Sequence, residues 1–67
     1  MVEWKKLPRS IRLEKGDVQC DVWPFLSKNG DRFSFTVMES TTGAYLAGGS
    51  AQTQDAACEA AMKEARI

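Results

Sequence analysis

The residue types that carry most enzyme chemistry are sparse in this 67-residue chain. It contains no histidine, which is the commonest general base and the commonest zinc ligand. The two cysteines, Cys20 and Cys58, therefore lack an activating imidazole, and two thiolates do not complete a four-ligand metal site. The carboxylates are scattered along the sequence. We expect no catalytic residue, no metal and no cofactor, so the chain is not expected to be an enzyme.

The cysteines and one glycine pair each allow a structural and a chemical interpretation. Cys20 and Cys58 lie in apolar patterns and fit small buried hydrophobic residues, or a disulfide if their Cβ atoms come within about 4 Å. Gly48-Gly49-Ser50 precedes a predicted helix, where its N–H groups would suit a phosphate, although it matches no phosphate-binding fingerprint. The same glycines would also allow a tight turn from strand to helix.

Composition predicts one small folded domain over residues 1–67, with residues 1–9 as a loosely ordered N-terminal arm. The chain is 43% hydrophobic, with six aromatic residues among its apolar side chains, which is enough for a small core. It has no run of about 18 apolar residues and no apolar signal-peptide segment at its N-terminus. These features predict a cytoplasmic protein that does not enter a membrane.

Turn signals divide the chain into short strands and one helix. Strands are predicted over 10–14, 18–26, 32–39 and 44–47, with Gly48-Gly49 ending the last one. A helix is predicted over 55–67 with Thr53 as its N-cap, because this segment has no Gly or Pro and is rich in Ala. The expected fold class is α+β, a three- to four-stranded antiparallel sheet with one C-terminal α-helix packed on one face.

A two-residue turn at Asn29-Gly30 would fix which side chains share a face of the sheet, since directly opposed residues point to the same side. The helix-covered face would carry Cys20, Val22, Pro24, Leu26, Phe33, Phe35 and Val37, joined by Leu46 if Thr42-Gly43 is also a two-residue loop. The opposite face would carry Asp21, Trp23, Phe25, Ser34, Thr36, Met38, Tyr45 and Ala47.

Four large side chains on the second face form the candidate partner-binding site: Trp23, Phe25, Met38 and Tyr45. With one helix available, no regular element covers them, and exposed patches of this kind often mark partner surfaces. Two alternatives remain open. Residues 1–13 fold back so that Trp4 and Leu7 cover the patch, or a one-residue register error disperses it. Pro24 in mid-strand also indicates a nearby sheet edge that would accept a partner's strand.

The zero net charge conceals a basic N-terminus. Residues 1–15 contain five basic and two acidic residues, a balance of +3, and residues 16–67 carry the compensating −3. The candidate basic arm consists of Lys5, Lys6, Arg9 and Arg12. It is either an ordinary solvated terminus or a docking arm for an acidic partner or a phosphate backbone.

One segment resembles the β-β-β-α pattern of several families of very small proteins. It comprises Gly30-Asp31-Arg32-Phe33-Ser34-Phe35-Thr36-Val37, then Gly43, then Gly49-Ser50-Ala51-Gln52-Thr53-Gln54-Asp55-Ala56-Ala57. The pattern is similar to the N-terminal domain of HicB-type antitoxins, to integrase arm-binding domains and to plant AP2-type DNA-binding domains. It also resembles anti-restriction and anti-CRISPR inhibitors of phages and mobile elements. The resemblance spans roughly residues 18–67 and is one of topology and spacing.

The resemblance implies two functional classes. DNA-binding members read the duplex with the sheet face away from the helix, where Arg and Lys are needed. Here that face carries Trp23, Phe25, Met38 and Tyr45, with only Lys28 and Arg32 near its tip. The expectation is therefore a non-enzymatic phage or mobile-element accessory protein that binds a protein partner through this aromatic face. The alternative is nucleic-acid binding through the basic arm and the same face. A homodimer would hide the exposed residues.

Overall fold

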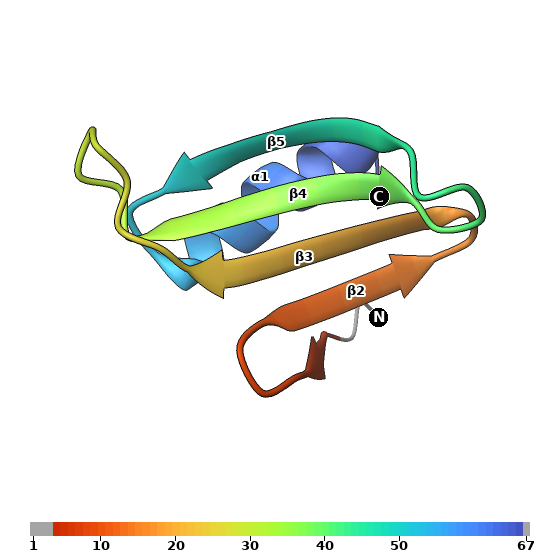
Figure 1. Ribbon diagram of the computed structural model, residues 1–67, viewed down its shortest axis with the longest axis horizontal. Helices are drawn as coiled ribbons and strands as arrows, with labels where there is room; N and C mark the ends of the chain where they lie inside the picture. Colours follow the sequence, from red (N-terminus) through yellow and green to blue (C-terminus); the bar gives the residue numbers. More distant parts are fainter. Residues whose placement is uncertain (1–3, 67) are drawn as a thin grey trace.

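The computed structural model describes residues 4–66, in which five strands form one antiparallel sheet and one helix packs against a single face of it (Figure 1). The elements are β1 (Lys5–Lys6), β2 (Ile11–Lys15), β3 (Val18–Pro24), β4 (Phe33–Glu39), β5 (Tyr45–Ala51) and α1 (Gln54–Ala65). Each strand lies beside its neighbour in sequence, in the order β1-β2-β3-β4-β5. The predicted α+β class is confirmed, with one strand more than expected because Lys5–Lys6 pairs with β2.

The pairing of β3 with β4 differs by two residues from the predicted register. Val22 lies opposite Phe35 rather than Val37, because the connection over 25–32 is longer than a two-residue turn. Gly30 still adopts the positive φ expected of its turn, at 91°. Because side chains alternate with a period of two, a shift by two residues leaves each strand residue on its predicted face.

A bulge between β4 and β5 overturns the predictions for Leu46 and Ala47. The register passes from Val37 opposite Ala47 to Met38 opposite Tyr45, which leaves Leu46 as the extra residue. Ala47 consequently packs against the core on the helix side, whereas Leu46 is 53% exposed. An inserted residue reverses the side-chain alternation beyond it, so no pattern of period two predicts both halves of this strand.

Gly48 and Gly49 lie inside β5 and do not end it, so they form neither the tight turn nor the phosphate-binding loop considered from the sequence. Their missing side chains leave room for aromatic rings on opposite faces of the sheet. A Cβ on Gly49 would come within 3.0 Å of the Phe35 ring, and a Cβ on Gly48 would overlap the Tyr45 hydroxyl. The glycine pair therefore lets one ring pack in the core and another lie across the opposite face.

The core lies between α1 and the sheet, and its buried hydrophobic residues are Leu13, Cys20, Val22, Phe35, Val37, Ala57, Cys58 and Ala61. The small helix residues bring the backbone of α1 close enough for the Cys20 thiol to donate a hydrogen bond to the Ala61 carbonyl oxygen, at 3.8 Å. Thr53 caps the helix as predicted, because its side chain accepts from the Ala56 N–H at 3.1 Å.

Pro24 and Leu26, which the predicted register assigns to the core face, are exposed, Leu26 by 73%. β3 ends at Pro24, and β2 begins opposite Val22 and does not reach it. The N–H of Phe25 donates to the Arg32 carbonyl oxygen and so points toward the β4 side of the strand. Because backbone groups alternate between the two sides of a strand, the nitrogen of Pro24 faces the β2 side. Proline is tolerated here because no β2 residue lies opposite it to accept a hydrogen bond.

Candidate functional site

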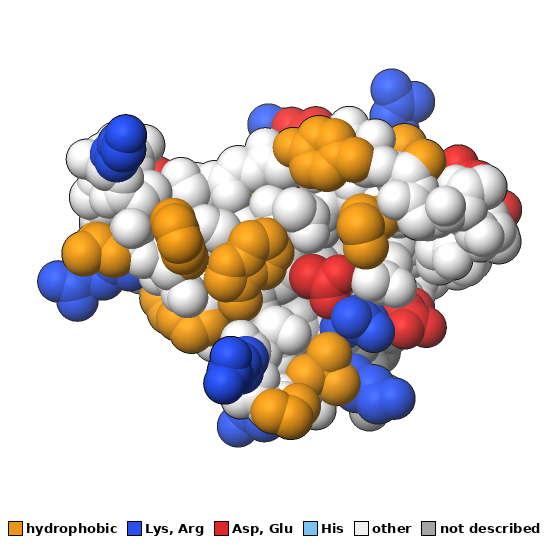
Figure 2. Space-filling view, in the orientation of Figure 1, with side chains coloured by type: hydrophobic (Ala, Val, Ile, Leu, Met, Phe, Trp, Pro, Cys, Tyr) orange, Lys and Arg blue, Asp and Glu red, His pale blue; other side chains and the backbone are white. Residues whose placement is uncertain are grey.

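The sheet face opposite α1, hereafter the outer face, has no element of residues 4–66 packed over it (Figures 1 and 2). Trp4 packs against the core on the helix side, together with Ile11. Leu7 lines a cavity beside the ends of β3 and β4. The prediction that Trp4 and Leu7 cover the aromatic patch is therefore wrong. Residues 1–3 lie outside the described part of the chain.

The four predicted binding residues stand on the outer face in two groups. Trp23 lies near the end of β3 and Phe25 directly follows that strand, where its N–H donates to the Arg32 carbonyl oxygen, whereas Met38 and Tyr45 lie opposite each other on β4 and β5. Met38 lies opposite Gln19, which is four residues before Trp23 on β3. At the usual rise per strand residue, this places the two groups about 13 Å apart. Asp21 lies between them on β3. Figure 2 shows the same division, with hydrophobic side chains in separate groups and charged side chains beside them.

Each of the two groups combines an exposed aromatic residue with a partly buried hydrophobic one. Phe25 is 57% exposed and Tyr45 is 67% exposed, while Trp23 and Met38 are half-buried. The Tyr45 ring lies over Gly48, so it is held against the sheet instead of extending into solvent. The site therefore presents two accessible aromatic rings, each beside a partly buried hydrophobic side chain.

A charged network separates these groups. Asp21 is only 9% exposed, and both of its carboxylate oxygens are bonded: Oδ1 accepts from Arg12 Nε and Oδ2 accepts from Gln19 Nε2, each at 2.8 Å. The hydrogen bond and charge of Asp21 raise the pKa of the Arg12 guanidinium. The sequence contains a signal for this pair, because a two-residue turn at Gly16-Asp17 places Arg12 opposite Asp21, as observed.

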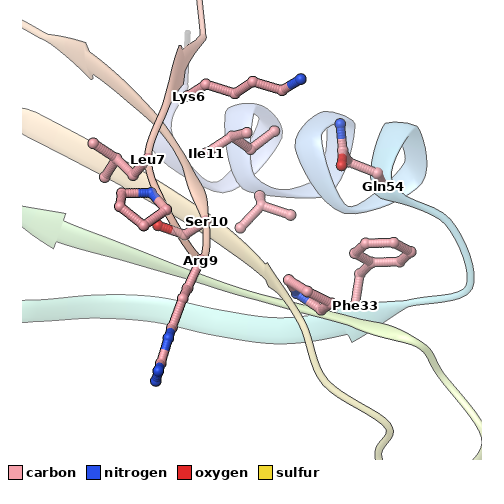
Figure 3. Close-up of a pocket in the computed structure, with 10 residues that line it drawn as sticks. Lys6, Leu7, Arg9, Ser10, Ile11, Phe33 and Gln54 are labelled. Atoms are coloured by element: carbon pink, nitrogen blue, oxygen red, sulfur yellow. The ribbon is translucent and has the colours of Figure 1, made fainter.

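The predicted basic arm does not form one positive surface. Lys5, Lys6 and Arg9 are exposed, but Arg12 is paired with Asp21. Lys5 and Lys6 are consecutive strand residues, so their side chains point to opposite faces. In Figure 3 the side chains of Lys6 and Arg9 extend in different directions. A partner on the outer face would therefore meet only part of this charge.

A cavity of about 200 Å³ opens where β3 extends past the start of β2, beside the N-terminus of α1 (Figure 3). Its apolar lining consists of Leu7, Pro8, Ile11, Val22, Pro24 and Phe33, and its polar lining of Lys6, Arg9, Ser10 and Gln54. Binding sites for small molecules are usually larger, about 300–1,000 Å³. The cavity is below this range and is not our candidate site.

The two thiols are part of the hydrophobic core. Cys20 and Cys58 are both buried and both free, so the disulfide alternative is not realised. Burial raises the pKa of each thiol, which keeps it protonated near neutral pH and weakens it as a nucleophile. Among residues 4–66, no group of three or more His, Cys, Asp or Glu side chains is placed to hold a metal ion.

Protein-family models, curated proteins and solved structures offer no match to this chain. Within the described residues, no helix is both long enough and apolar enough to cross a membrane.

Proposed function

We propose that this protein is a non-catalytic, cytoplasmic binding module that holds a protein partner against its outer face. The observation that carries the proposal is the uncovered sheet face with Trp23, Phe25, Met38 and Tyr45, two of which are more than half exposed. Aromatic residues and Met are enriched at protein interfaces, and a few such side chains usually supply most of the binding free energy.

The arrangement of the outer face favours a protein over a nucleic acid. The two hydrophobic groups flank a nearly buried carboxylate, Asp21, whose paired cation Arg12 is already neutralised. A phosphate backbone approaching this face would find Arg12 already paired with Asp21, whereas nucleic-acid-binding faces present free Arg and Lys. A protein surface with apolar side chains at two points and polar groups between them matches the face better.

The resemblance in strand and helix order to short phage and mobile-element proteins supports an accessory role of this kind. In such a role the chain acts by occupying a surface of its partner, which requires contact residues and no catalytic group. The two buried thiols and the lack of histidine are consistent with that mode of action.

The test is a pull-down from nuclease-treated host lysate, with tagged wild-type protein and the variant Trp23→Ala/Tyr45→Ala as baits. Leu26→Ala is the matched control, because it also removes an exposed hydrophobic side chain but lies outside the outer-face groups. We expect a defined protein to be retained by wild type and by Leu26→Ala and lost with the double variant. Circular dichroism establishes that all three baits are folded.

Two outcomes contradict the proposal. Equal retention by the double variant would show that the outer face is not the contact surface. If material is retained from untreated lysate but nothing is retained from nuclease-treated lysate, nucleic acid, and not a protein, is the ligand. In that case Lys5, Lys6 and Arg9 become the residues to substitute.

A further inference from the structure

The two edges of the sheet are protected to different degrees. β1 forms one edge with only two residues, both lysines, and Pro8 follows closely. Short length, lysine and proline are the usual means by which proteins prevent an edge strand from pairing with another chain. β5 forms the other edge with seven residues, none of which is charged or proline. The unprotected edge therefore lies at β5.

The backbone of β5 has hydrogen-bonding groups directed away from the sheet. The Ala51 carbonyl oxygen accepts from the Arg32 N–H at 3.1 Å, so the backbone groups of Ala51 face β4. Backbone groups alternate between the two sides of a strand, which directs those of Ser50 and Gly48 to the open side. No strand among residues 4–66 lies on that side to pair with them.

We propose that β5 pairs antiparallel with β5 of a second copy of this chain, joining the two sheets edge to edge. A two-fold axis at Gly49 sets Gly48 of each copy opposite Ser50 of the other. Each such pair exchanges two hydrogen bonds, so one register satisfies the open-side N–H and C=O groups of both residues in both copies. This interface is separate from the outer face and does not depend on the function proposed above.

A second copy fits this edge without steric or electrostatic conflict. The segment from Ala47 to Ala51 carries only Ala, Gly and Ser side chains, and the chain has zero net charge. α1 contacts β3, β4 and β5, so it lies over β4. In the joined sheet the two β4 strands are three strand spacings apart, about 14 Å, whereas packed helices need about 8–10 Å. The helices therefore lie side by side on one face without overlapping.

The first test measures molar mass by analytical ultracentrifugation over a range of protein concentrations. Leu46→Lys adds a charge at the open edge, imitating the lysines of β1, at a side chain that is 53% exposed. Leu26→Lys is the matched control, since it makes the same change at an exposed leucine in the β3–β4 connection. We expect wild type and Leu26→Lys to reach twice the 7.4 kDa chain mass and Leu46→Lys to remain at 7.4 kDa.

The second test uses hydrogen exchange of the wild-type protein and is independent of any variant's folding. Pairing predicts that the Gly48 and Ser50 amides become protected as concentration rises, whereas the Gly49 and Ala51 amides are protected throughout. A wild-type mass of 7.4 kDa at every concentration overturns the proposal. It is also overturned if Trp23→Ala abolishes the dimer while Leu46→Lys keeps it, because self-association would then use the outer face.

Discussion

Asp21 places a nearly buried carboxylate on the outer face, and hydrogen bonds from two side chains compensate for its burial. Arg12 and Gln19 each bond one oxygen, and the Asp21 side chain is 12% exposed in this arrangement. Arg12 lies directly opposite Asp21 on β2, and among residues 4–66 no other cation is ion-paired with this carboxylate. The pair thus allows a charged residue to lie between two hydrophobic groups.

Removing Arg12 should leave this carboxylate with one side-chain partner. We expect Arg12→Ala to lower the free energy of unfolding by about 1–3 kcal/mol, less than for a fully buried pair because the Arg12 side chain is 35% exposed. Urea denaturation measures the change. Adding Asp21→Asn should restore part of the loss, since no buried charge then remains. If Arg12→Ala unfolds with the same midpoint as the exposed control Lys5→Ala, the pair does not stabilise the fold.

The buried thiols predict how stability depends on pH. Burial raises the folded-state pKa of Cys20 and Cys58 above the ordinary value of 9.0, so the unfolded chain loses its thiol protons first. Their stabilising contribution is fully present below about pH 9 and is lost as the pH rises through the raised folded-state values. Denaturation curves from pH 7 to 10 should therefore fall more steeply for wild type than for Cys20→Ala/Cys58→Ala. Parallel pH profiles for the two proteins would contradict this origin.

Among the elements, β5 has two glycines that each lie against an aromatic ring, and the two rings differ in how much room they have to move aside. The Tyr45 side chain across Gly48 is 67% exposed and has solvent beside it into which it can be displaced, whereas the Phe35 ring against Gly49 is 6% exposed and packed in the core. The same added methyl group should therefore have different consequences at adjacent positions of one strand.

We expect Gly49→Ala to destabilise the fold by about 1–3 kcal/mol, the usual cost of overpacking a core. Gly48→Ala should cost less stability, because the displaced Tyr45 ring moves into solvent, and it should weaken partner binding. Thermal denaturation and the pull-down described above measure the two effects. Equal destabilisation by both variants, or unchanged partner binding by Gly48→Ala, would show that the Tyr45 ring is not held where the structure places it.

The elements also show which features of the fold a sequence can predict. The helix and its Thr53 cap are predictable because capping and alanine content act within one or two turns of chain. The face of each β3 residue is predictable despite a two-residue register error, because such an error preserves the alternation. Leu46 and Ala47 are not predictable, because the bulge depends on how β4 and β5 fit each other.

The candidate site was predictable in its members but not in its shape. Trp23, Met38 and Tyr45 lie on the outer face by their register, and Phe25 continues the alternation one residue beyond β3, where its N–H donates to the Arg32 carbonyl oxygen. Their separation into two groups depends on the register of three strands together, which places the Arg12–Asp21 ion pair between them. The path of residues 4–10 is a tertiary property as well, since it is defined by the pairing of β1 with β2 and by the packing of Trp4 against the core.

For the molecule as a whole, the distribution of charge predicts how weakly it should bind nucleic acid. The chain has nine basic and nine acidic residues, and Arg12 of the predicted basic arm is neutralised by Asp21, which leaves Lys5, Lys6 and Arg9 as its exposed cations. Each neutralised phosphate contributes about −0.7 to −0.9 to the slope of log affinity against log salt concentration, so three contacts give a slope no steeper than about −3.

Fluorescence anisotropy with labelled single-stranded and duplex DNA, at salt concentrations from about 50 to 200 mM, measures that slope. We expect weak binding whose residual affinity is removed by Lys5→Ala/Lys6→Ala/Arg9→Ala. The protein partner captured in the pull-down should instead remain bound over the same salt range, because contacts made by Phe25 and Tyr45 bury apolar surface and release no counterions. Tight DNA binding with a slope much steeper than −3 would mean that more cations reach the phosphates than the structure exposes on this arm, and it would favour the nucleic-acid function over the protein-binding one.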